Sequence, residues 1–148
     1  MRSLVILLSM ILVGISPLAG EEGDEVKGLW WTEDEGAIVE IYREDGAYYG
    51  KLKWLEDPYD EDGNPLTDDE NPDEEKRDRP LKGLEILKDL EYNGDKQWSD
   101  GEIYDPENGT TYSCRMQLED GELHVRGYYG ISALGRTQVW EPAEETPE

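Results

Sequence analysis

The chain has 148 residues, of which 37 are Asp or Glu and 14 are Lys or Arg, and its formal net charge is −23. This length suits one domain, and a single Cys and a single His exclude a disulfide framework, a Cys-type zinc cluster and an iron–sulfur site. Such an acidic chain predicts no nucleic-acid partner. Because no nucleotide-binding or nucleophile motif is present, we expect no catalytic residue and no cofactor. An exported enzyme without a local motif is the alternative.

The first twenty residues have the pattern of a signal peptide. Arg2 supplies a positive start, residues 4–15 are almost entirely apolar, and residues 16–20 hold small residues and a proline. The apolar run is shorter than the roughly 18 residues that a membrane-spanning helix needs. We therefore expect residues 1–20 to be removed on export to the periplasm or the medium, which leaves no stable membrane anchor. An uncleaved anchor is the alternative.

The mature chain, residues 21–148, consists of short β-branched and aromatic segments separated by turn sequences such as Asp45-Gly46 and Asn93-Gly94. Strands are expected over residues 26–32, 37–43, 47–55, 81–90, 98–104, 110–118, 122–129 and 135–140. This spacing predicts an all-β fold, a small antiparallel up-and-down barrel of about eight strands, with an open sandwich as the alternative. The acidic, proline-bearing residues 141–148 are expected to be frayed.

Residues 56–79 interrupt the strand pattern with twelve acidic residues. Their mutual repulsion and lack of apolar residues predict a long surface loop. Asp60 and Asp62 fit the third and fifth positions of a calcium-binding loop, which makes them the weak candidates for a metal site. However, Pro58 falls where the first Asp is needed and Asp69 where the final Glu belongs. We therefore expect a solvated acidic surface and no metal centre.

The single Cys and the single His are each expected to have no catalytic or metal-binding role. An exported protein gains nothing from a free exposed thiol, so Cys114 is expected to be buried as a small hydrophobic residue. His124 lies between Leu123 and Val125 in a strand. If those two face the core, His124 lies on the outer face as an ordinary surface residue.

Several ordered motifs resemble an uncharacterised family of short exported bacterial proteins, known only as a domain of unknown function. The motifs are Gly28-Leu29-Trp30-Trp31, Asn71-Pro72, Arg79-Pro80-Leu81-Lys82-Gly83-Leu84, Gly101-Glu102-Ile103-Tyr104-Asp105-Pro106, Val125-Arg126-Gly127-Tyr128 and Gly135-Arg136-Thr137-Gln138-Val139-Trp140. The resemblance covers nearly the whole mature chain and implies export and a lipocalin-like barrel, without an established reaction. The chain departs from the pattern by an acidic insertion around residues 57–70 and by Lys82, where a Cys often stands.

One further detail is similar to lipocalins in general, in which a Gly-x-Trp opens the first strand and an Arg of the last strand covers that Trp. Gly28, Trp30 and Arg136 hold these places here. An Arg on an indole face gains cation–π energy while its guanidinium caps backbone carbonyls. We therefore assign these three residues to barrel closure, which is a structural role.

The aromatic residues are five Trp and nine Tyr with no Phe, so every aromatic side chain carries a polar group. These residues predict either a packed core or a cavity that binds a small apolar or amphiphilic ligand. The interior ligand-binding candidates are Trp30, Tyr48, Trp54, Tyr112, Met116, Arg126 and Tyr128. Leu123, Val125, Gly127 and Tyr129 form the more apolar face of the strand that holds Arg126, and both faces cannot point inward.

The alternative hypothesis is a barrel with a filled core. Such a protein would have a structural or interaction role and would act through its acidic surface on a cationic partner or a divalent cation.

Overall fold

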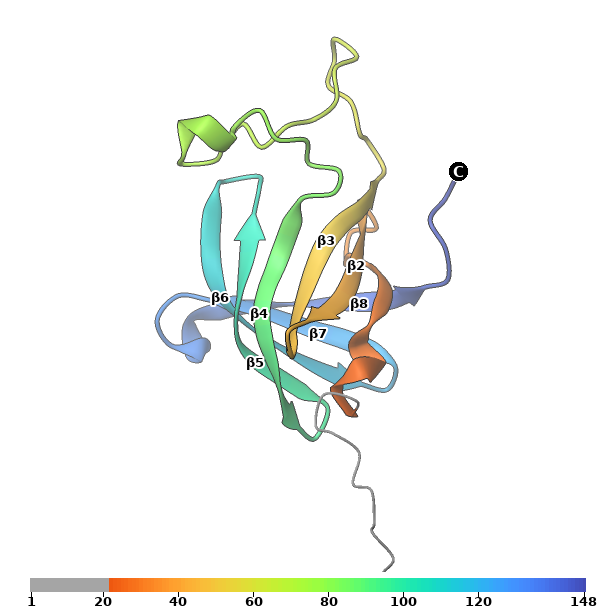
Figure 1. Ribbon diagram of the computed structural model, residues 1–148, viewed down its shortest axis with the longest axis vertical. Helices are drawn as coiled ribbons and strands as arrows, with labels where there is room; N and C mark the ends of the chain where they lie inside the picture. The colour runs from red at the N-terminus through yellow and green to blue at the C-terminus, as the bar shows by residue number, and fades with distance from the viewer. Residues whose placement is uncertain (1–21) are drawn as a thin grey trace, which may run out of the picture.

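Eight antiparallel strands close into one barrel, and each strand pairs with the next in chain order until β8 pairs with β1 (Figure 1). The computed structural model describes residues 22–148, so the predicted signal peptide, residues 1–20, lies outside the described residues. The strands are β1 (Gly28–Trp31), β2 (Ala37–Glu44), β3 (Ala47–Leu55), β4 (Glu85–Gly94), β5 (Gln97–Asp105), β6 (Thr110–Glu119), β7 (Glu122–Tyr128) and β8 (Gly135–Ala143). The predicted eight-stranded barrel is confirmed, and closure removes the exposed edges of an open sandwich.

Within residues 22–148, three short 3₁₀ turns accompany the strands: η1 (Gly23–Val26), η2 (Glu74–Lys76) and η3 (Ser132–Leu134). The element η2 lies in the long loop between β3 and β4, which extends beyond the barrel in Figure 1. None of the helices within residues 22–148 is long and apolar enough to cross a membrane.

The β2–β3 hairpin shows how local sequence sets the fold. Asp45 and Gly46 have positive φ values of 50° and 82°, the conformation that a tight two-residue hairpin turn requires. On β2, Ala37, Val39 and Ile41 share one face and belong to the buried core, as their alternation predicts. The hairpin and its inward face are therefore confirmed.

Large side chains fill the barrel through most of its length. Trp98, Trp140 and Tyr48 are the largest fully buried residues, and they join Leu87, Leu90 and other aliphatic residues in one core cluster. The Trp98 ring contacts the Tyr48 ring edge-on, with centroids 6.3 Å apart. Interiors of this kind have little room for a ligand.

Cys114 belongs to the same cluster and is fully buried, which confirms its predicted place in the core. Burial raises the pKa of its thiol to about 12, because the thiolate would lie in an apolar environment. The thiol is therefore protonated and unreactive at neutral pH.

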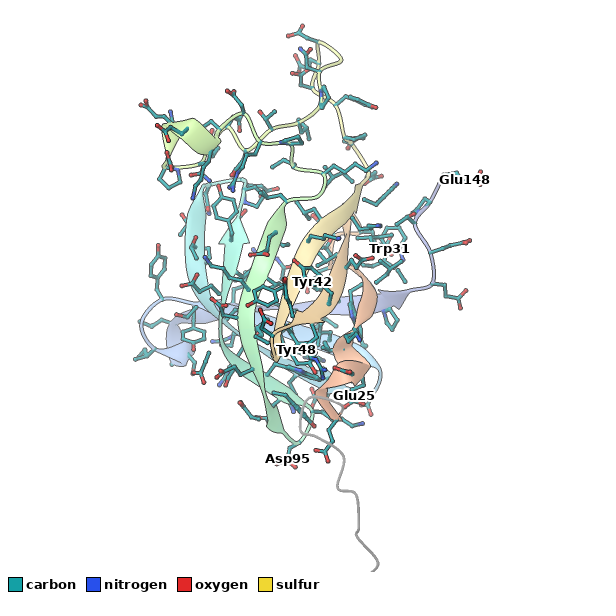
Figure 2. The ribbon with its side chains drawn as sticks, viewed as in Figure 1. Glu25, Trp31, Tyr42, Tyr48, Asp95 and Glu148 are labelled. Atoms are coloured by element: carbon teal, nitrogen blue, oxygen red, sulfur yellow. The ribbon has the colours of Figure 1, made fainter. Side chains whose placement is uncertain are left out.

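The turn η1 covers one end of the barrel, which we call the η1 end. The indole Nε1 of Trp30 donates to the carbonyl oxygen of Val26 at 2.8 Å, and the Tyr48 hydroxyl donates to the Asp24 carboxylate at 2.7 Å. Tyr48 lies beside this turn in Figure 2. Burial and the neighbouring Asp24 raise the pKa of Tyr48 to about 12. The indole N–H of Trp30 and the hydroxyl of Tyr48 thus hold the turn η1 in place.

The Tyr48–Asp24 hydrogen bond predicts a modest loss of stability in Tyr48→Phe. The free energy of unfolding should fall by about 1–2 kcal/mol, because a partly buried hydrogen bond to a charged group is lost while the ring stays in place. Urea unfolding would measure this change. Tyr49→Phe is the matched control, since its hydroxyl donates to Asp89 at the surface, and it should change stability by less than about 0.5 kcal/mol. Equal losses in the two variants would contradict the proposed role of Tyr48.

The prediction that Arg136 covers Trp30 is wrong. Trp30 pairs with Pro142 in the β1–β8 ladder, so Arg136 lies six residues earlier on β8, about 20 Å away along an extended strand. The Arg136 side chain is 81% exposed, and its Nη2 lies 4.0 Å from a carboxylate oxygen of Glu33. The register of β8 therefore separates the guanidinium from the indole, and η1 covers Trp30 in its place.

Two predicted boundaries also change. The strand expected over residues 81–90 begins at Glu85 and continues to Gly94. Residues 141–143 were expected to be frayed, but they form the end of β8 and pair with β1 from Trp31 to Leu29. These residues close the barrel, because β1 has no other partner on that side.

Candidate functional site

At the end of the barrel opposite η1, which we call the Tyr112 end, inward-facing residues are only partly buried. Ile103 near the end of β5, Tyr112 near the start of β6 and Gly127 on β7 meet here, and all three are only partly buried. A Cβ placed on Gly127 would lie 3.2 Å from Cγ2 of Ile103 and 3.5 Å from Cβ of Tyr112. The absent side chain lets these inward-facing groups approach one another while they remain in contact with solvent.

The loop between β7 and β8, residues 129–134, extends this apolar surface outward. Tyr129, Ile131 and Leu134 are 61%, 63% and 71% exposed, and they are three of the four exposed large hydrophobic residues in the described chain. The ring of Tyr129 packs edge-on against that of Tyr112, with centroids 5.1 Å apart. Clustered exposed apolar groups of this kind mark binding surfaces more often than scattered ones do.

Polar groups surround this apolar surface. The side-chain amide of Asn108 donates to the Tyr112 hydroxyl at 3.2 Å. The side chain of Gln138 accepts a hydrogen bond from the Trp140 indole at 3.0 Å, and Arg136 at the start of β8 is exposed to solvent. An apolar surface with a polar border of this kind suits a molecule that has both an apolar and a polar part.

Four of the seven predicted ligand-binding residues are on the inward face. Trp30, Tyr48 and Met116 are buried in the filled part of the barrel, where they contact other core residues. Tyr112 alternates with Cys114 and Met116 on β6 and lies at the accessible end. Of these four residues, Tyr112 is the one that the structure places at the candidate site.

Trp54 lies on the outer face, which corrects its predicted interior position. In the β2–β3 ladder Val39 pairs with Leu52, whereas the preceding residue, Ile38, pairs with Trp54, so β3 carries an extra residue at Lys53. Such a β-bulge reverses the alternation of faces along the strand. The Trp54 ring instead contacts that of Trp31 edge-on, with centroids 5.5 Å apart.

Arg126 and Tyr128 also face outward, which corrects the second part of that prediction. Their neighbours Leu123 and Val125 are buried in the core, so alternation places residues 124, 126 and 128 on the outer wall. The Arg126 guanidinium donates from Nε to the carbonyl oxygen of Ser132 at 2.7 Å and from Nη1 to the Thr137 hydroxyl at 2.9 Å. Arg126 thereby holds the β7–β8 loop against the wall.

His124 shares this outer wall, as predicted from its buried neighbours. Its Nε2 lies 3.5 Å from a carboxylate oxygen of Glu119, which is itself more than half exposed.

Asp68 was not recognised in the sequence, although its burial organises the long acidic loop. Its carboxylate is fully buried and accepts hydrogen bonds from the Tyr104 hydroxyl at 2.5 Å, the Asn71 amide at 2.7 Å and Nη2 of Arg79 at 3.0 Å. Burial alone would raise the pKa of Asp68, but these three donors hold it below the usual 3.8. The loop is thus fixed to β5 through an ionised carboxylate.

The same loop contacts the β5–β6 turn and encloses a groove. A Cβ on Gly109 would lie only 1.9 Å from the carbonyl oxygen of Glu70, so the turn and the loop touch through their backbones. Between residues 71–79 and the outer face of β4–β6 lies a groove of about 340 Å³. Asn71, Arg79 and Tyr104, which fix the loop through Asp68, belong to the sequence motifs, but the motifs did not predict that they share a partner.

Asp60 and Asp62 do not form an assembled cation site in the structure. A carboxylate oxygen of Asp60 accepts hydrogen bonds from the backbone N–H groups of Asp62 and Asn64, at 2.9 and 2.8 Å. This pattern stabilises a turn. Within residues 22–148, no three acidic, His or Cys side chains are grouped so that they could hold a metal ion.

A closed, eight-stranded, antiparallel barrel in which each strand pairs with the next is a lipocalin-like fold. The structure is similar to that of the Helicobacter pylori protein HP1028, which is described as belonging to the lipocalin family, with a TM-score of 0.72 over 80% of this chain and 83% of that chain. The two are 23% identical in sequence, so the similarity concerns the fold. No curated protein matches this chain.

Residues 28–142 match the family described as "Uncharacterized protein conserved in bacteria (DUF2147)". The chain belongs to this family, and the match runs from the first residue of β1 to the penultimate residue of β8.

Proposed function

We propose that the protein is an exported, non-enzymatic barrel that binds a small apolar or amphiphilic molecule at the Tyr112 end. The observation that carries this proposal is the contact between the exposed Tyr129 of the β7–β8 loop and Tyr112, which lies beside Gly127 and Ile103 on the inward face. The same loop also holds the exposed Ile131 and Leu134. The export part of the proposal rests on the signal-peptide pattern of residues 1–20.

The filled core limits how such a ligand is bound. Trp98, Trp140 and Tyr48 occupy the deeper barrel, so the apolar part of the ligand contacts the Tyr112 end and the β7–β8 loop without entering further. Its polar part would meet water and the bordering groups, among them Gln138 and Arg136. A short-chain amphiphile therefore fits the geometry better than a long lipid does.

Leu134→Ser tests the proposed site, with dodecanoate and dodecanol as probes in a fluorescence titration or by calorimetry. We expect saturable binding to the unmodified protein and about tenfold weaker binding to Leu134→Ser, because burial of a leucine contributes about 1.5–3 kcal/mol. Gly127→Val should also weaken binding, since its side chain would occupy the space beside Ile103 and Tyr112.

Tyr59→Ser is the matched control, because Tyr59 is 62% exposed in the distant β3–β4 loop, and it should bind the probes unchanged. A titration without saturation for either probe would reject the proposal and favour the filled-core alternative, in which the protein acts through its acidic surface. The complete burial of Trp98 and Trp140 is the observation that favours this second function.

A further inference from the structure

The outer wall of the barrel carries a second hollow, which is separate from the Tyr112 end. This groove has a volume of about 440 Å³ and extends across β5–β8 and the β4–β5 turn. Its lining includes the basic side chains of Arg115, His124 and Arg126 together with Ser99, Gln117 and Thr137. No Asp or Glu lines this groove in the described chain, although acidic residues outnumber Lys and Arg by 37 to 14. The groove is therefore a locally cationic region on an acidic protein.

The two arginines face one another directly. Arg115 on β6 is the cross-strand partner of Arg126 on β7, and like charges in this position destabilise a sheet. Neither guanidinium forms an ion pair with a carboxylate of residues 22–148, whereas eight other Lys and Arg side chains of that range do. Repulsion between the two guanidinium groups therefore destabilises the ligand-free protein, and an anion bound between them would offset this repulsion.

The guanidinium of Arg126 is already fixed in position. Its hydrogen bonds to the Ser132 carbonyl and the Thr137 hydroxyl use Nε and Nη1, and the remaining N–H groups stay available. A guanidinium held in this way loses little conformational entropy when it binds a ligand. Together with the guanidinium of Arg115, it offers donors that match the oxygens of a carboxylate or a phosphate.

Neutral hydrogen-bonding groups complete the lining. Gln117 is the cross-strand partner of His124, and Ser99 and Thr137 supply hydroxyl groups that both donate and accept. Such groups suit the hydroxyls of a polar ligand. The nearest carboxylate to His124, that of Glu119, lies 3.5 Å from the imidazole and does not itself line the groove.

From this lining we infer that the outer groove of β5–β8 binds a small anionic, hydroxyl-bearing ligand, with its carboxylate or phosphate group between Arg115 and Arg126. The net charge of the protein repels anions at long range, so binding depends on these local groups and weakens as salt screens them. The groove shares no lining residue with the Tyr112 end, although Arg126 also holds the β7–β8 loop through the Ser132 carbonyl.

Calorimetric titration at low ionic strength tests the inference with three probes. D-glucuronate has both the charge and the hydroxyls, inorganic phosphate has the charge alone, and D-glucose has the hydroxyls alone. We expect glucuronate to bind, phosphate to bind more weakly, and glucose not to bind. Tighter binding of phosphate than of glucuronate would still support the anion site and would assign it to phosphate groups. Equal binding of glucose and glucuronate would overturn the inference.

Arg115→Gln should weaken glucuronate binding at least tenfold without lowering the melting temperature of the free protein, since it removes a like-charge contact. Arg126→Lys keeps the charge but loses the planar fork, and should weaken binding severalfold. Lys82→Gln removes the same charge as Arg115→Gln at an exposed position of the β3–β4 loop outside the groove, and should leave the affinity within twofold. The inference fails if neither anion saturates, or if Lys82→Gln weakens binding as much as Arg115→Gln does.

Discussion

Asp68→Ala is expected to lower the free energy of unfolding by about 3 kcal/mol, because it removes one partner of a buried, charged hydrogen-bond network. The carboxylate is fully buried, and its loss leaves the Tyr104 hydroxyl, the Asn71 amide and one Arg79 donor without their acceptor. The β3–β4 loop would then lose its main polar contact with β5. Urea unfolding would measure the change in stability, and limited proteolysis would report release of the loop.

Asp69→Ala is the matched control, because Asp69 is the adjacent residue and is exposed. It removes the same charge and should change stability by less than about 0.5 kcal/mol. If the two alanine variants lose the same stability, the effect comes from general charge repulsion in the acidic loop, and the assigned role of the network is wrong.

The contribution of Asp68 to the stability of the fold decreases as the pH falls. The pKa of Asp68 lies below 3.8 in the folded protein, so the unfolded chain binds the proton more readily, and ionised Asp68 stabilises the fold above pH 3.8. This contribution disappears as the pH falls through the lowered pKa. The stability difference between the unmodified protein and Asp68→Asn should therefore be largest near neutral pH and should shrink below pH 3.8.

The strands could be predicted because they depend on neighbours in sequence. In β2 the alternation of Ala37, Val39 and Ile41 with polar residues defines an inward face, and Asp45-Gly46 fixes the turn that follows. The burial of Cys114 follows from the same alternation with Met116. None of these inferences requires knowledge of a distant segment.

The incorrect residue placements depend on distant segments. The extra residue at Lys53 places Trp54 on the outer face. The residue types of β3 do not predict this bulge, because it is defined by the pairing of Trp54 with Ile38 on the neighbouring strand. The pairing register between β1 and β8 places Arg136 far from Trp30, and these two strands lie more than 100 residues apart in sequence. The pairing register of two strands so far apart in the chain is not encoded in the residues around either one.

In the candidate sites, too, the residues placed by local alternation were predicted, and those placed by contacts between distant segments were missed. Tyr112 was predicted to lie at the interior site because local alternation places it on the inward face. The exposed residues Ile131 and Leu134 and the arginine pair on the outer wall were missed. Exposure and cross-strand pairing are tertiary properties, and residues such as Leu134 carry no motif. Sequence therefore gave candidate side chains for one site, whereas the fold was needed to group them.

Gly101→Ala is expected to lower the free energy of unfolding by about 3 kcal/mol or more, and it tests directly whether the deeper barrel is filled. The added Cβ would lie 2.5 Å from Cγ of Leu90 and 2.7 Å from the backbone oxygen of Lys88. Both distances are far shorter than a carbon contact allows, so β4 and β5 must separate or Leu90 must leave its position. Thermal and urea unfolding would measure the loss.

Gly127→Ala is the matched comparison, because it adds the same methyl group to the inward face at the Tyr112 end and not in the deeper barrel. Gly127 also faces inward, but its added Cβ would lie 3.2 Å from Ile103 and 3.5 Å from Tyr112, and both neighbours are at the accessible end. A shift of a few tenths of an ångström relieves this contact, so we expect a loss below about 1 kcal/mol. If Gly101→Ala were tolerated equally well, the deeper barrel would have unused space, and a ligand could penetrate beyond the Tyr112 end.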